Sequence, residues 1–540
     1  MIPPQRSYDQ RHQRLRGLTE TVNSASSRRA NARLLPAQSA ILIALAVYGF
    51  ALPVFLIQAL PIYSSVDRIL AWILFVVGTV PLIRATVQPT GVPLIHFVAG
   101  QYVLFFSLPV FFEQNMHLQL SGWVVPASGA ITVALVCALL ALISIGVGYR
   151  LCGRIFNLRF KFLLFQPNLE RLFWYGAAIV VGSFLLQLEV LALFGVARSA
   201  GIARPLELVF STDLGLAILA CLYHAGRLSA WKRPFVITLV VIAVVIGFAG
   251  GMIQNAAEPV VIWLVCGWVI RRKAPVIWLA VIAAVFFALQ PVKGTYRSIL
   301  RLSPQPLSTI RKVELYSGLV ENYWTGKGGR TAQIMNRNRE SASNRLSLLL
   351  TTAHYIEWTP YPIPYKNGVT LAYLGYTWIP RAVWPEKPIA QVANKILPVE
   401  YDIQTAANTE TTMFGVGHLA EAYVNFGVIG IVPVFLLLGC LYRIPNLLLE
   451  RRTTPATMAI YVALTVAMFP IGSSIGDAFG GFVQQILLQG VLLRFFTASR
   501  RKVHERPQMP VYRVADATPR LSRGARPGAV AVSPMDEGSR

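Results

Sequence analysis

Charged residues are scarce in this chain. Asp, Glu, Lys and Arg make up 14% of its 540 residues, and hydrophobic residues make up 55%. An average soluble domain contains about 25% charged residues. The low charge therefore excludes an ordinary water-soluble enzyme and predicts a protein that crosses a membrane several times.

Nucleotide-binding motifs and cysteine clusters are missing as well. Neither GxxxxGK[ST] nor a Gly-rich dinucleotide fingerprint occurs, so bound nucleotide is not expected to drive this protein. The cysteines show no CxxC or Cys/His ligand spacing, so no zinc site is indicated, and none of them lies in the long polar segment described below. They are Cys137, Cys152, Cys221, Cys266 and Cys440. We expect no metal and no cofactor, and a substrate that carries its own activation.

Long apolar runs dominate what is present. About 20 apolar residues cross a bilayer core as a helix, and candidates lie near 38–58, 69–83, 93–112, 126–148, 172–193, 206–225, 234–252, 255–270, 275–291, 424–442, 456–472 and 479–496. The runs at 69–83 and 255–270 are short, and are expected to extend at their ends or to be re-entrant. The prediction is an all-α polytopic membrane protein with about twelve transmembrane helices.

Basic residues set the predicted orientation, because short cytoplasmic loops carry the excess of Lys and Arg. With the N-terminus inside, fifteen basic residues fall in short inner loops and three in short outer loops. Both termini are then cytoplasmic, and one large periplasmic loop lies between spans 9 and 10. The predicted parts are a basic tail at 1–36, helices 1–9 at 37–291, the loop at 292–418, helices 10–12 at 419–496, and a disordered cytoplasmic tail at 497–540.

The net charge of +25 is concentrated toward the two ends of the chain. Seven basic residues precede Pro36 and ten lie between Arg494 and Arg540. In these positions they would meet anionic lipid headgroups. We therefore expect membrane lipids as partners and no nucleic acid.

Ionisable residues within or beside the spans are few, and each is a functional candidate because charge in lipid is costly. They are Glu189, Asp213, Glu258 and Asp477. Glu189 and Asp213 are also candidates for structural pairing with an Arg of the loop between them. A proton-coupled transporter would have more such residues and two matching halves with broken helices.

The large outer loop is rich in basic and aromatic residues. It holds fourteen Lys and Arg against eight Asp and Glu. Such a surplus suits an anionic ligand at the membrane surface, since Arg matches phosphate oxygens, although lipid headgroups alone would also explain it. The aromatic residues include Tyr355, Trp358, Tyr361, Tyr365, Tyr373, Tyr376, Trp378 and Trp384. They suit either sugar stacking or a membrane interface.

Three segments organise this loop. An apolar stripe from Ala342 to Ala353, with Glu340, Asn344, Ser347 and Thr351 opposite, predicts an amphipathic helix with Arg345 at the stripe edge. Prolines at 380, 385 and 388 predict a stiff, extended segment that holds Arg381 and Lys387. His418, Glu421 and Asn425 share one face of a helix that enters the bilayer from outside.

The order of three sequence motifs resembles Wzy-type O-antigen and exopolysaccharide repeat-unit polymerases. They are GVTLAY at 368–373, IPRAVWPEKP at 379–388 and EAYVNFG at 421–427, followed by a span. The resemblance implies an enzyme of the bacterial inner membrane that transfers a growing glycan from its polyprenyl-diphosphate carrier onto a new lipid-linked repeat unit. It also implies a flippase and a chain-length regulator as partners.

The diphosphate is already a good leaving group, so such an enzyme must neutralise charge, orient substrates and accept a proton. The candidate catalytic residues are Arg381, Arg345, Glu421 and His418, with Glu421 the preferred base. The candidate substrate-binding residues are Lys387, Arg198, Arg204 and Trp384. An O-antigen-ligase-type transferase, a lipid-linked oligosaccharide flippase and an assembly scaffold remain open as alternatives.

Overall fold

The structure is a computed structural model. It describes residues 47–87, 94–111, 116–118, 122–155, 165–187, 209–249, 253–271, 275–289, 309–325, 348–376, 391–409, 413–451, 454–468 and 470–498, and also Leu206, Val292, Thr295, Tyr296, Ile299, Leu300, Ile379, Trp384, Glu386 and Lys387. Statements about structure below concern these residues.

Each of the twelve predicted apolar segments contains a helix. The helices of these segments are Val47–Gln58, α2 (Ser65–Val87), α3 (Leu94–Tyr102), α4 (Ser128–Ile155), α5 (Leu169–Gln187), α7 (Thr212–His224), α8 (Lys232–Ala249), α9 (Ile253–Arg271), α10 (Val276–Leu289), α17 (His418–Arg451), α18 (Pro455–Ala467) and α20 (Phe482–Thr497). The two segments that looked short in sequence extend at their ends, to 23 residues in α2 and 19 in α9.

Shorter elements join these helices. A π-helical turn η1 (Val103–Ser107) and a 3-10 turn η2 (Leu108–Phe111) extend α3, and β1 (Met116–Leu118) pairs with β2 (Gly122–Val124) as a hairpin with Met116 opposite Val124. Residues 292–418, predicted as the large outer loop and called the outer-loop segment below, contribute α12 (Thr309–Thr325), α14 (Leu348–Glu357), η6 (Ala372–Gly375), α15 (Val392–Glu400) and α16 (Ala406–Thr409). In sequence, α19 (Ile475–Phe479) lies between α18 and α20.

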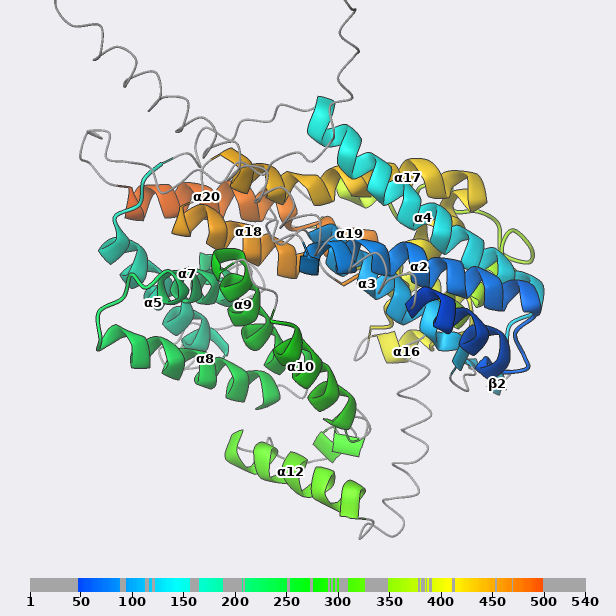
Figure 1. Ribbon diagram of the computed structural model, residues 1–540, viewed down its shortest axis with the longest axis horizontal. Coiled ribbons are helices and arrows are strands. Elements are labelled where there is room, and N and C mark those ends of the chain that lie inside the picture. The colour runs from blue at the N-terminus through cyan, green and yellow to red at the C-terminus, as the bar shows by residue number, and fades with distance from the viewer. Residues whose placement is uncertain are drawn as a thin grey trace, which may run out of the picture.

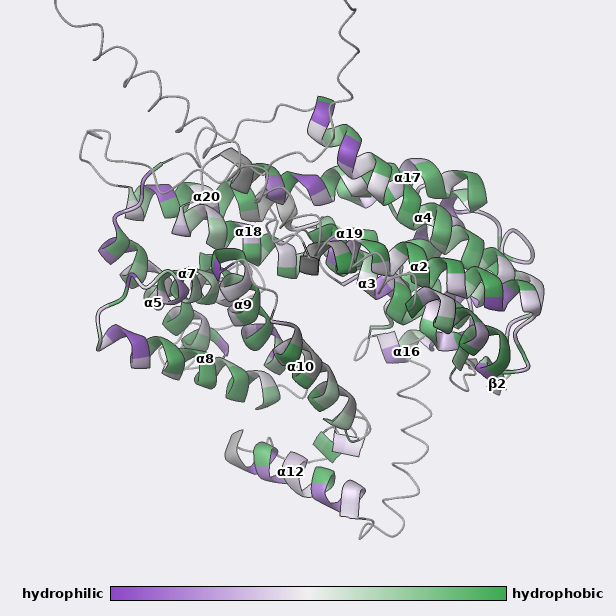
Figure 2. Cartoon of the chain, in the orientation of Figure 1, coloured by the Kyte–Doolittle hydropathy of each residue, from purple (hydrophilic) through white to green (hydrophobic). Residues whose placement is uncertain are grey.

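Five helices within the described residues are long and apolar enough to cross a membrane. Hydrophobic residues cover most of α4, α8 and α17, whereas α12 is largely polar (Figure 2). Large apolar side chains also remain exposed, such as Ile429, Phe495 and Ile277, at 88%, 80% and 78%. Exposure of this extent is expected where lipid surrounds the protein. The architecture therefore fits an all-α membrane protein.

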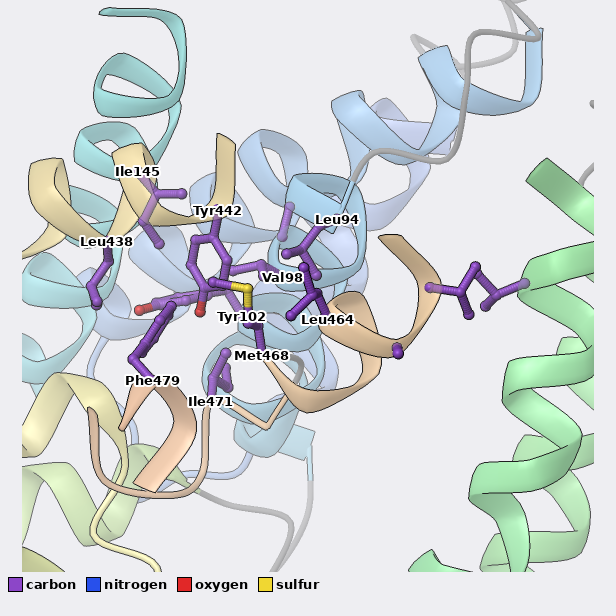
Figure 3. Packing of buried hydrophobic residues seen from close by; sticks show 14 of the residues in the cluster. Leu94, Val98, Tyr102, Ile145, Leu438, Tyr442, Leu464, Met468, Ile471 and Phe479 are labelled. Atoms are coloured by element: carbon purple, nitrogen blue, oxygen red, sulfur yellow. The ribbon is translucent and has the colours of Figure 1, made fainter. Parts of the chain in front are cut away.

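Most of the long helices fall into two groups (Figure 1). The first contains α2, α3, α4 and α17, and the second contains α5, α7, α8, α9 and α10. α18 packs against both, because it contacts α17 as well as α7 and α9. Figure 3 shows the core where α3, α4, α17, α18 and α19 meet, around Tyr102, Tyr442, Met468 and Phe479.

The first group is built around close contact between α4 and α17. A Cβ added at Gly148 of α4 would lie 2.1 Å from the carbonyl oxygen of Leu436, and one added at Gly439 of α17 would lie 2.3 Å from the carbonyl oxygen of Ile145. Small residues at helix interfaces in membranes let backbones approach in this way. The sulfur of Cys440 donates to the Gly148 carbonyl at 3.4 Å. The glycines therefore fix how closely the two helices pack.

α17 folds back on itself at Gly427, whose φ of 64° and ψ of −162° are not helical. The ring of Phe479 lies 5.8 Å from that of His418 and 5.4 Å from that of Tyr442, so these two rings are at most about 11 Å apart. A straight helix would separate residues 418 and 442 by about 36 Å. The helix predicted to enter the bilayer near His418 is therefore broken at Gly427, and residues 418–426 form a separate helix beside the one that follows.

The amphipathic helix predicted up to Ala353 is described from Leu348, and α14 is buried on all sides. Its apolar residues pack against α4, α17 and η1, and Thr351 on the predicted polar face is only 6% exposed. The polar face was wrong because α14 inserts between other elements of the protein instead of lying at a surface.

A small hydrophobic core lies next to α14. This loop core consists of Tyr355, Ala393, Leu397, Tyr401, Val416, Ala420 and Val424. His354 Nε2 donates to the Tyr401 carbonyl at 2.9 Å, since a carbonyl oxygen can only accept, and the hydroxyls of Thr359 and Tyr401 lie 2.6 Å apart. Burial lowers the pKa of His354, so its ring is neutral. The outer-loop segment thus has its own packed interior, joined to the start of α17.

Candidate functional site

Buried and partly buried residues from four chain segments form polar contacts around α19. We call this the central polar network. It consists of Gly368, Thr370, Gln391, Asn394, His418, Glu421, Asn425, Ser473, Ser474 and Asp477. Buried polar groups in a membrane protein need internal partners, so a network of this size is built by the fold.

Glu421 is completely buried, with 0% exposure. One carboxyl oxygen, Oε2, accepts from the backbone N–H of Ile475 at 2.6 Å, and the other, Oε1, has no hydrogen-bond partner among the described residues. Thr370 and Asp477 lie close enough to interact with this carboxyl group. Glu421 therefore ties the start of α17 to the start of α19.

Asn425 joins the outer-loop segment to α17. Its Oδ1 accepts from the Gly368 N–H at 2.9 Å, and its Nδ2 donates to the Thr370 hydroxyl and to the Glu421 carbonyl, each at 2.7 Å. The N–H groups of Lys366 and Asn367 donate to the carbonyls of Val424 and Asn425 at 2.9 and 3.1 Å. The helix end exposed by the break at Gly427 is thereby satisfied by the chain just before GVTLAY.

Asp477 is the partly exposed carboxylate of the network. Its Oδ1 accepts from Gln391 Nε2 at 2.8 Å and its Oδ2 accepts from the Ser473 hydroxyl at 2.5 Å. Asn394 donates to the same Ser473 hydroxyl at 3.1 Å and accepts from the Val416 N–H at 3.1 Å. Sequence reasoning named Asp477 only as an ionisable residue between the last two spans. Gln391 and Asn394 gave no signal, since their role depends on where α15 lies.

His418 is 1% exposed. Its backbone N–H donates to the Ile471 carbonyl at 3.0 Å, and its ring Nε2 has no partner among the described residues. Glu421 and His418 do share one helix face with Asn425, as the spacing predicted. That face is directed into the protein, against the link between α18 and α19.

The remaining predicted residues are only partly described. Trp384 is 37% exposed and its ring lies 5.6 Å from Tyr376, which is 42% exposed. Lys387 Nζ donates to the Ile379 carbonyl at 2.8 Å. Arg198, Arg204, Arg345 and Arg381 lie outside the described residues, as does Glu189. The structure therefore brings Glu421 and His418 together, and the predicted arginines stay predictions.

Metal-type clusters and disulfides are not found in the described part of the chain. No group of three or more His, Cys, Asp or Glu side chains gathers there. All five cysteines are free thiols, with Cys221 and Cys266 of α7 and α9 at 3.5 Å between sulfurs.

A second set of buried polar residues lies between α5, α7 and α9. Asp213 and Glu258, which we call the carboxyl pair, are partly buried and within electrostatic range of each other. Neither has a hydrogen bond or an ion pair with another described residue. Near Asp213, the hydroxyls of Ser183 and Thr212 are hydrogen-bonded, and Gln187 Nε2 donates to both at 3.1 and 3.3 Å.

Comparison with known proteins gives one match. A family model described as "Domain of unknown function (DUF8712)" matches residues 235–451, less than half of the chain. That range begins in α8 and ends with α17, so it includes the outer-loop segment, His418, Glu421 and Asn425 but not Asp477. No curated protein and no solved structure matches the chain.

Proposed function

We propose that this protein polymerises polyprenyl-diphosphate-linked oligosaccharide repeat units into O-antigen, capsule or exopolysaccharide at the outer face of the bacterial inner membrane. The observation that carries the proposal is a pair of hydrogen bonds at Asn425, whose Oδ1 accepts from the Gly368 N–H and whose Nδ2 donates to the Thr370 hydroxyl. Two of the three motifs behind the resemblance to Wzy-type polymerases are thus held together in a buried polar site.

The third motif supports the same proposal. Trp384 of IPRAVWPEKP lies beside Tyr376, with both rings partly exposed. Tyr376 directly follows η6, which packs against α19 of the central polar network. Paired aromatic faces suit stacking on a sugar. A glycan held there would lie close to α19, which carries Asp477.

In the proposed reaction, the hydroxyl of the acceptor sugar attacks the anomeric carbon of the donor glycan, and the diphosphate leaves with the electron pair of the broken bond. Arg345, Arg381 and Lys387 would neutralise the diphosphate, with Arg198 and Arg204 as helpers. A carboxylate of the central polar network would take the hydroxyl proton. We propose cytoplasmic termini and a periplasmic outer loop, as the basic residues predict.

The proposal is tested with purified protein in liposomes supplied with lipid-linked repeat units. We expect a ladder of products that differ by one repeat unit, and Arg381→Ala protein at the same membrane level is expected to leave single units. Transfer of finished glycan to a different acceptor, without a ladder, would indicate a ligase instead.

A lipid-linked oligosaccharide flippase is the second candidate, and the break in α17 favours it. Broken helices that line a site within the membrane are a common feature of transporters. In the same liposomes, a flippase would move repeat units across the bilayer without elongating them. That outcome would replace the polymerase proposal.

A further inference from the structure

The two carboxylates of the central polar network differ in what can reach them. Glu421 is fully buried, and its Oε2 is bonded to a backbone N–H that opens α19. Asp477 is partly exposed, two residues further along the same helix. A base must come within hydrogen-bond distance of the proton that it removes. Of these two carboxylates, Asp477 is the one that a substrate arriving from outside can reach.

Asp477 is also oriented, which a solvated surface carboxylate is not. Gln391 Nε2 holds Oδ1 from α15, and the Ser473 hydroxyl holds Oδ2 from the link before α19. Each carboxylate oxygen has two acceptor sites, and among the described residues only one side-chain donor reaches each oxygen, which leaves the other site for a hydroxyl. Two fixed donors on neighbouring elements keep the carboxylate in one position.

The exposed aromatic pair belongs to the same place in the fold. η6 packs on α19, and Tyr376 with its partner Trp384 follows η6. A sugar stacked on these rings would lie beside the element that packs on α19, the helix that carries Asp477. The outer-loop segment thus contributes both an aromatic surface and, through Gln391, one of the donors that orient Asp477.

We propose that Asp477 is the catalytic base that contacts the acceptor sugar, and that Glu421, the base preferred from sequence, is a positioning residue that acts through Ile475. The inference rests on the proposed polymerase function. The hydroxyl oxygen of the acceptor forms the new bond to the anomeric carbon of the donor. The bond from that carbon to the phosphate oxygen breaks, and its electron pair leaves on the diphosphate. The hydroxyl proton moves to the Asp477 carboxylate.

The test compares full-length variants in the liposome ladder assay. Asp477→Asn keeps the size of the side chain but removes the base, so turnover is expected to fall about 100-fold or more. Its thermal unfolding and its KM for lipid-linked donor are expected to stay close to those of the unaltered protein. Asp477→Glu is expected to recover part of the turnover. Asn408→Ala, an exposed change on α16, is the control for handling of variants.

Glu421 gives the opposite pattern if it only positions α19. Glu421→Gln keeps an oxygen that can accept from the Ile475 N–H, and is expected to retain turnover within about tenfold of the unaltered protein. Glu421→Ala loses that acceptor and is expected to lose both turnover and thermal stability. A base at Glu421 would make Glu421→Gln as inactive as Glu421→Ala, with Asp477→Asn still active, and this result would overturn the assignment.

Two further outcomes decide the remaining cases. If Asp477→Asn does not fold, Gln391→Ala removes one donor to the carboxylate without changing it, and is expected to lower turnover about tenfold. Unchanged turnover in folded Gln391→Ala protein would contradict the role of Asp477. If the unaltered protein makes no ladder at all, the polymerase proposal fails and the assignment of Asp477 fails with it.

Discussion

The central polar network and the carboxyl pair both contain two carboxylates inside the helix bundle, but they are built differently. Glu421 and Asp477 receive donors from a backbone N–H, a hydroxyl and an amide on separate elements. Asp213 and Glu258 lie within electrostatic range of each other and have no such donors within the described residues. Charged groups with fixed donors are characteristic of a preorganised site. The difference indicates that the central polar network is the better candidate for a catalytic site.

The backbone contacts that support the two regions differ as well. At Gly148, which supports the α4 and α17 pair, an added Cβ would meet the Leu436 backbone at 2.1 Å, whereas at Gly215 of α7 it would meet the Val180 side chain at 2.6 Å and the Gly176 carbonyl oxygen at 3.0 Å. Gly148→Ala is expected to cost about 3 kcal/mol or more and Gly215→Ala about 1 kcal/mol, since a side chain moves more easily than a backbone. Thermal unfolding in detergent measures both.

Gly146→Ala is the matched control for these glycine variants, because nothing lies within 4 Å of a Cβ at that position. Its unfolding temperature is expected to stay the same or to rise slightly, as Ala favours helix more than Gly does. Equal losses at Gly148 and Gly215 would show that the two regions depend equally on close helix contact.

The next largest effect is expected within the central polar network. Asn425→Ala would leave the Gly368 N–H buried without an acceptor and would free the outer-loop segment from α17. We expect a loss of about 2 kcal/mol in stability and loss of ladder formation. Protease digestion of the outer-loop segment in folded protein provides the measurement. Resistance equal to that of Asn408→Ala protein would mean that Asn425 does not hold the segment.

Acidification is expected to lower the stability of the protein through His354, which lies next to the loop core. The pKa of His354 is lowered in the folded state, first by burial, so protonation favours the unfolded state. The stability due to neutral His354 is present above its unfolded pKa of about 6.5 and is lost as the pH falls, by at most about 1.4 kcal/mol at pH 5.5. His354→Gln is expected to reduce the drop in unfolding temperature between pH 7.5 and 5.5. An unchanged drop would mean that other groups cause it.

The carboxyl pair should give the smallest effect. Asp213→Asn or Glu258→Gln removes one of two carboxyl groups that lie within electrostatic range of each other, so stability is expected to stay level or to rise by up to about 1 kcal/mol, with ladder formation retained. The ladder assay and thermal unfolding are run on the same preparations. Loss of the ladder in either variant would place a functional site in the second group of helices too, and the contrast between the two regions would disappear.

Hydropathy was sufficient to locate the helices, because a helix in lipid must be apolar along its whole length. The same signal could not show the fold-back at Gly427, since an apolar run containing glycine also fits a continuous membrane helix. The burial of Thr351 was missed because threonine hydroxyls can be satisfied inside a protein. Glu421 and His418 were found from helix spacing, but the orientation of Asp477 depends on Gln391, 86 residues away in sequence.

The link between α18 and α19 has a consequence for the order of biogenesis. It closes over residues that are made much earlier, because the Ile471 N–H donates to Gln101, 370 residues before it, and the Ile475 N–H donates to Glu421. Until Ile471 and Ile475 have been synthesised, the side chains of Gln101 and Glu421 lack these two N–H donors. The last helices to be synthesised therefore complete the site, and a chain shortened before α18 would keep most of its spans and have no site.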